Sequence, residues 1–102
     1  MSKPSVCFIG GGNMARSLIG GLIAAGTEPQ YITVGEPDSE LRDQLTNLFG
    51  IRTLANNVTA ARDSDIVILA VKPQIMETAI ASISDLLSQK NPLLISIAAS
   101  IN

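Results

Sequence analysis

The chain has 102 residues, enough for one domain, and 46% of them are hydrophobic while only 16% are charged. A small domain cannot bury all of so many apolar residues, so some apolar surface should remain to line a ligand cleft or to contact another domain or subunit. Seven lysines and arginines against nine aspartates and glutamates, without a basic run, exclude an electrostatic footprint for nucleic acid, and the lack of histidine with a lone Cys7 excludes histidine-ligated metals and internal disulfides.

The first apolar run, Val6 to Ile9, has only four residues before the glycines at 10–12. It is too short for a signal peptide, and no stretch approaches the ~20 apolar residues of a membrane span. We therefore expect a cytoplasmic protein without a membrane partner. A continuous apolar run of this length predicts a strand buried on both faces.

A helix is predicted next, because apolar residues recur at helical spacing from Met14 to Ala25 and Gly26 can end it. Gly20 and Gly21 inside this helix cost about 1 kcal/mol each relative to alanine. We expect a helix that keeps them to pack its backbone closely on the sheet.

Tyr31–Val34 is rich in β-forming residues and is bounded by Gly35, which predicts a second strand. Asp38 then has the position of a helix N-cap, and the helix should run to Gly50. Its apolar stripe consists of Leu41, Leu45, Leu48 and Phe49.

The second half repeats the alternation. Ile51–Leu54 predicts a third strand, Asn57 a cap for a short helix through Ala61, and Asp65–Val71 the most clearly buried strand. A helical pattern begins at Pro73 and continues through Leu87, and the last predicted strand covers Pro92–Ala98.

Strands that alternate with helices form βαβ units with right-handed crossovers. We therefore predict an α/β fold of Rossmann type, a doubly wound parallel sheet in the order 3-2-1-4-5 with helices on both faces. A sixth strand would complete the usual plan.

Residues 10–15, Gly-Gly-Gly-Asn-Met-Ala, fit the pattern G-x-G-x-x-G/A between a buried strand and a helix, which is the context of a dinucleotide site. Gly10 would permit the tight turn, Gly12 the approach of a pyrophosphate, and Ala15 close helix packing. Free N–H groups at the helix start would hold the phosphates. The alternative is a glycine-rich turn that binds nothing.

Glu36 follows the second strand, 21 residues beyond Ala15, where a carboxylate can accept the ribose hydroxyls of NAD and repel the 2′-phosphate of NADP. The alternative is an ordinary loop glutamate, because Gly35 precedes it and Arg42 lies near enough in sequence to offset its charge.

Other candidates flank the same end of the sheet. Lys72 should point to the cleft mouth, or else be a solvated loop lysine, and Asn57 could both cap its helix and contact the adenosine. Small residues at Ala98 and Ala99 suit the close approach of a nicotinamide. Cys7 is predicted to be a core residue rather than a reactive thiolate.

Four motifs occur in order: residues 8–15, Gly20-Gly21-Leu22, Ala70-Val71-Lys72-Pro73 and Ser96-Ile97-Ala98-Ala99. Together they resemble the N-terminal cofactor domain of pyrroline-5-carboxylate reductase, the last enzyme of proline biosynthesis. The resemblance implies that residues 1–102 are the NAD(P)-binding Rossmann domain of a longer two-domain enzyme. The cofactor contacts that it implies are Gly10, Gly11, Gly12, Asn13, Met14, Glu36, Asn57, Ala70, Val71, Lys72, Ala98 and Ala99.

The implied reaction is hydride transfer from NADPH or NADH to the C=N carbon of 1-pyrroline-5-carboxylate, which gives L-proline. Family members continue into a helical domain that forms the dimer and much of the substrate pocket, so the resemblance implies a homo-oligomer, a dimer or higher, and little activity for these residues alone. We assign no catalytic residue. The sequence departs from the family at Ser100, usually glycine, and Glu36 contrasts with the family's frequent use of NADPH.

Two other functions remain open: the cofactor domain of a β-hydroxyacid-dehydrogenase-like reductase, and a non-enzymatic NAD(H)-binding module. We expect the apolar surface that a following domain would cover to include Ile75, Met76, Ile80 and residues 97–101.

Overall fold

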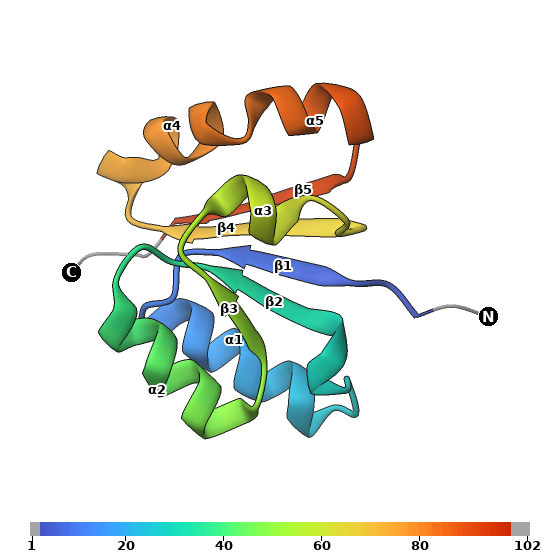
Figure 1. Ribbon diagram of the computed structural model, residues 1–102, viewed down its shortest axis with the longest axis vertical. Coiled ribbons are helices and arrows are strands. Elements are labelled where there is room, and N and C mark those ends of the chain that lie inside the picture. The colour runs from blue at the N-terminus through green and yellow to red at the C-terminus, as the bar shows by residue number, and fades with distance from the viewer. Residues whose placement is uncertain (1–2, 99–102) are drawn as a thin grey trace.

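A computed structural model describes residues 3–98 and has at its centre a five-stranded, all-parallel sheet (Figure 1). The strand order β3-β2-β1-β4-β5 confirms the predicted doubly wound topology. The strands are β1 (Val6–Ile9), β2 (Ile32–Gly35), β3 (Arg52–Leu54), β4 (Ile66–Val71) and β5 (Leu93–Ala98). The helices are α1 (Asn13–Ala24), the 3₁₀ turn η1 (Pro29–Tyr31), α2 (Ser39–Phe49), α3 (Asn57–Ala61), α4 (Pro73–Ser82) and α5 (Ser84–Lys90).

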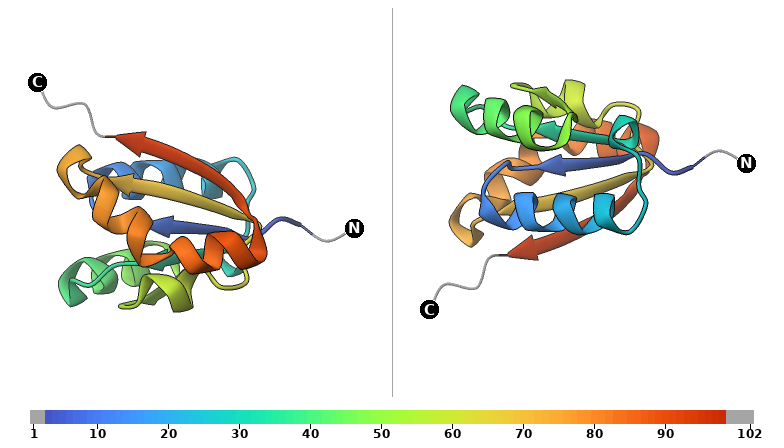
Figure 2. Two further views of the ribbon diagram at one scale, coloured as in Figure 1. Left: turned by 90° about the horizontal axis from the view of Figure 1, so that it is seen from above. Right: turned by 90° about the horizontal axis from the view of Figure 1, so that it is seen from below.

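The helices form two layers. Helices α1 and α2 cover one face of the sheet, and α3, α4 and α5 cover the other (Figures 1 and 2). Successive residues of the central strand β1 face opposite layers, so Phe8 packs in the α1–α2 core while Cys7 and Ile9 pack in the α3–α5 core. All four residues of β1 are buried, which explains why its sequence is continuously apolar.

Three local expectations were wrong. Tyr31 ends the 3₁₀ turn η1 rather than beginning β2, which instead continues to Gly35. The single helix predicted after Pro73 is broken at Ile83, whose φ of −120° and ψ of 12° leave the helical region. Gly20 lies against the Phe49 ring of α2, and nothing lies within 4 Å of a Cβ built on Gly21, so these glycines do not bring α1 onto the sheet.

Exposed apolar side chains gather on the edge strand β5, where Leu93 is 60% exposed. Leu94 and Ile95 are also exposed, and Ile97 is half-buried. Ile75 is exposed as expected, whereas Met76 and Ile80 pack partly buried against the α3–α5 core. Residues 99–101 lie outside the described range. Within that range no helix is long and apolar enough to cross a membrane.

Candidate functional site

The turn between β1 and α1 depends on Gly10. Its φ of +105° is a left-handed conformation, and its amide donates to the Gly35 carbonyl at 2.9 Å. A Cβ at this position would collide with the carbonyl oxygen of Ala70. Gly10 therefore lets the backbone pass between the ends of β2 and β4.

Gly12, in contrast, faces open space: no atom lies within 4 Å of a Cβ built on it. Gly12 is the N-cap of α1 and, as a glycine, has no side chain to bond to the free amides of the first turn. Its carbonyl accepts the first helical hydrogen bond, from the Arg16 amide, at 3.0 Å. The first-turn amides of an α-helix have no intrahelical partners, and the macrodipole makes that end positive. This is the geometry of an anion-binding site.

The next residues fix α1 beneath this opening. Ala15 is fully buried against the core, as its predicted packing role requires. Met14 is half-buried against the same core, while Asn13 is exposed at the helix start.

The Glu36 side chain is buried to 9% exposure, and its carboxylate joins two turns. Oε1 accepts the Gly11 amide at 2.8 Å, and Oε2 accepts the Asp38 amide at 3.0 Å. A Cβ on Gly11 would lie 3.1 Å from both Glu36 Cγ and Leu45 Cδ1, so a side chain there would press on the packing of Glu36. Glu36 thus links the glycine turn to the turn that begins α2. The sequence could not reveal this link, because it joins residues 25 positions apart.

Arg42 approaches the same turn from α2. Its Nη1 donates to the carbonyls of Glu36 at 2.8 Å and Pro37 at 2.9 Å. No salt bridge joins Arg42 to the Glu36 carboxylate among the described residues, so the guanidinium binds the backbone of Glu36 rather than its charged group. Asp38 caps α2 as predicted, accepting from the Glu40 amide at 2.9 Å.

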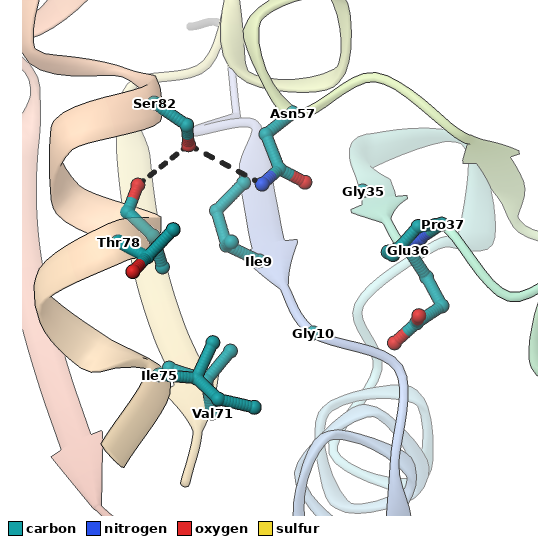
Figure 3. A pocket seen from close by; sticks show the side chains of 11 residues that line it. Ile9, Gly10, Gly35, Glu36, Pro37, Asn57, Val71, Ile75, Thr78 and Ser82 are labelled. Atoms are coloured by element: carbon teal, nitrogen blue, oxygen red, sulfur yellow. Dashed lines mark hydrogen bonds between the residues drawn. The ribbon is translucent and has the colours of Figure 1, made fainter. Parts of the chain in front are cut away.

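A pocket of about 280 Å³ lies at the carboxyl ends of β1, β2 and β4, between α3 and α4 (Figure 3). Its walls are mainly apolar, and Glu36 and Asn57 border it on one side. Helix α4 adds Thr78 and Ser82, one helical turn apart. Neither residue was predicted from the sequence, where their spacing was the only signal.

Asn57 is not the cap of α3. That role belongs to Asn56, whose Oδ1 accepts the Thr59 amide at 3.0 Å. Asn57 instead begins the helix and lines the pocket, where its Nδ2 donates to Ser82 Oγ at 3.4 Å (Figure 3). Its buried Oδ1 has no hydrogen-bond partner in the part of the chain described.

A second hollow of about 260 Å³ adjoins this pocket and runs along the glycine turn. Both are lined by Gly10, Glu36, Val71 and Ile75, so they form one cleft across the strand ends. Lys72 is exposed at its mouth, immediately before Pro73 begins α4. The remaining members of the lining are Gly11, Gly12, Leu41 and Ala70.

At the far side of the cleft the predicted residues are only partly described. Ala98 pairs with Val71 at the end of β5, whereas Ala99 lies outside the described residues. Over residues 3–98 no cluster of three potential metal ligands exists. Cys7 lies buried beneath the cleft, and burial raises the pKa of its thiol to about 12, so it is not a reactive thiolate.

This geometry agrees with comparisons of the chain with known proteins. A family model described as NADP oxidoreductase coenzyme F420-dependent matches residues 5–100. The chain belongs to this family. It is 42% identical over 102 residues to the pyrroline-5-carboxylate reductase of Vibrio alginolyticus. This match covers 100% of the chain and 37% of the Vibrio enzyme.

Solved structures give the same result. The pyrroline-5-carboxylate reductase of Coxiella burnetii matches with a TM-score of 0.91 and 36% identity over 99% of this chain and 37% of the other. Pyrroline carboxylate reductase of Plasmodium falciparum, solved with NADP bound, matches with a TM-score of 0.79 and 27% identity. The match covers 100% of this chain and 36% of the other. The resemblance seen in the four motifs is confirmed, and the chain spans about 37% of the length of the Vibrio relative.

Proposed function

We propose that this chain binds a nicotinamide dinucleotide across the cleft at the carboxyl ends of β1, β2 and β4. The observation that carries the proposal is Gly12, which starts a 12-residue helix and leaves open space above its free amides. The pyrophosphate would lie there, with Asn13 and Met14 in the same helical turn.

The two ends of the ligand would extend to either side. The adenosine would occupy the pocket that Glu36 and Asn57 border. The nicotinamide would lie toward Ala70, Val71 and Lys72, with Ala98 and Ala99 beyond them. A buried carboxylate at the ribose position opposes a 2′-phosphate, so we propose that NADH binds more tightly than NADPH.

We further propose that the complete enzyme is a pyrroline-5-carboxylate reductase. A bound reduced nicotinamide supplies the hydride, and this chain holds and orients the cofactor beside the C=N bond of 1-pyrroline-5-carboxylate. The 42% identity to a named reductase favours this reaction over that of a β-hydroxyacid dehydrogenase or a non-enzymatic module. A cytoplasmic homo-oligomer, dimer or higher, assembled through a C-terminal domain, completes the proposal.

Calorimetric titration of the 102-residue chain with NADH and then NADPH tests the cofactor site. We expect both to bind, NADH the more tightly. Binding of neither would refute the site, and tighter binding of NADPH would refute the role given to Glu36. A steady-state assay with 1-pyrroline-5-carboxylate should show little turnover, because the cleft carries no group to which we assign proton transfer.

A further inference from the structure

One arginine side chain braces the turn from β2 into α2, in addition to the bonds that the Glu36 and Asp38 carboxylates make there. Arg42 is half-buried, and its Nη1 bridges the carbonyls of Glu36 and Pro37 at 2.8 and 2.9 Å. Both contacts are charge-assisted, which makes them stronger than bonds between neutral groups. They fix two successive peptide units at the place where the cleft wall begins.

These contacts restrain the Glu36 carboxylate from behind. Its Oε2 bonds to the Asp38 amide within the turn that Arg42 holds, and its Oε1 bonds to Gly11 in the glycine turn. If the Glu36–Pro37 backbone moved, the carboxylate would lose its place between these amides. The Glu36 amide is held separately by the Leu54 carbonyl at 2.8 Å, so Arg42 braces the carbonyl side of the same turn.

We propose that Arg42 is a positioning residue that sets the preference between NADH and NADPH. It acts through Glu36, by holding that carboxylate where a ribose hydroxyl can bond to it and a 2′-phosphate is repelled. This inference rests on the proposed function, because it assumes that the dinucleotide occupies this cleft.

The competing role for an arginine close to this turn is direct contact with a 2′-phosphate. In this structure the two carbonyls hold Nη1 instead. The two roles predict opposite effects of removing the guanidinium. Loss of a phosphate ligand would weaken NADPH binding more than NADH binding, whereas loss of a positioning residue would weaken NADH binding more.

The test is calorimetric titration of Arg42→Met, which keeps the unbranched stem but removes the donors. We expect the Kd for NADH to rise about tenfold, the effect of one net hydrogen bond, while the Kd for NADPH changes less than about threefold. The ratio of the Kd for NADPH to the Kd for NADH should therefore fall. Equal losses, or a greater loss for NADPH, would overturn the inference.

Two further variants complete the design. Arg62→Met removes an exposed arginine at the far end of α3 and should leave both constants unchanged. Arg42→Lys keeps the positive charge but lacks the planar guanidinium, so its ratio of the two dissociation constants should lie between those of the unsubstituted chain and Arg42→Met. This variant still tests the inference if Arg42→Met does not fold. An unchanged ratio in Arg42→Lys would show that a positive charge alone is enough to position Glu36. Failure of the unsubstituted chain to bind either dinucleotide would refute the proposed function itself.

Discussion

Gly10 and Gly12 lie two residues apart, but the backbone places opposite demands on them. Alanine at Gly10 meets both a φ of +105° and the Ala70 carbonyl, so we expect Gly10→Ala to lower the free energy of unfolding by about 3 kcal/mol. At Gly12, where φ is −81° and no atom is near, we expect Gly12→Ala to cost at most about 1 kcal/mol. Its methyl group should instead exclude the pyrophosphate and weaken NADH binding more than about tenfold.

Urea denaturation and calorimetric titration measure these two effects separately. Gly21→Ala is the matched control, since Gly21 is exposed within α1 with nothing within 4 Å, and should raise stability by about 0.5–1 kcal/mol. If Gly12→Ala bound NADH as tightly as the unsubstituted chain, the phosphate would not lie over Gly12.

Two neighbouring asparagines at the start of α3 have different roles: Asn56 caps the helix, and Asn57 lines the pocket. We expect Asn56→Ala to lower the free energy of unfolding by about 1 kcal/mol, through loss of the cap on Thr59, and to leave NADH affinity unchanged. Asn57→Ala should cost less stability, because its buried Oδ1 has no partner and its Nδ2 makes only the 3.4 Å bond to Ser82, but it should weaken NADH binding. Thermal unfolding and calorimetry of both variants would show a reversed pattern if Asn57 were the cap.

The order of the elements could be predicted from sequence because it follows from alternating periodicity and from the handedness of the crossovers. Details that depend on a single residue could not. Asn56 and Asn57 are equally good caps by residue type, so only the path of the chain after β3 distinguishes them. At Ile83 the apolar spacing continues across the break between α4 and α5, without a glycine or proline to mark it.

The candidate site divides in the same way. The glycine turn was predictable because its spacing reflects local backbone geometry. The position of Glu36 was predictable too, but its bond to Gly11 was not, since it depends on the pairing of β1 with β2, which brings together the residues after Ile9 and Gly35. Thr78 and Ser82 face the pocket only because α4 packs beside α3.

For the molecule as a whole, the excess of apolar residues has two destinations. Most of it fills the two cores on either side of the sheet. Much of the rest lies on β5, where the register places Leu93, Ile95 and Ile97 on the same face as Ile66 and Ile68 of β4. Ile68, Ile95 and Ile97, together with Phe8 of β1 and residues of α1, line a hollow of about 360 Å³ on that face. Figure 2 shows that β5 lies at the edge of this face, beyond α1.

The free energy of unfolding of the whole chain depends on the protonation of Cys7, which lies in the central strand β1 with no exposed surface. Burial raises the pKa of its thiol from 9.0 to about 12, so the folded chain keeps the proton over a pH range in which the unfolded chain releases it. The contribution of this thiol is therefore fully present below pH 9 and is lost as the pH rises toward 12.

We expect the free energy of unfolding to fall between pH 9 and 12 by up to about 1.4 kcal/mol per pH unit on account of Cys7. Urea denaturation at several pH values, compared between the unsubstituted chain and Cys7→Ala, isolates this slope from any pH dependence that both proteins share. The alanine variant should be less stable at pH 7, because it leaves a small cavity, but its stability should fall less steeply above pH 9. Parallel profiles would mean that the thiolate forms as readily in the folded sheet as in the unfolded chain, and hence that Cys7 is within reach of water.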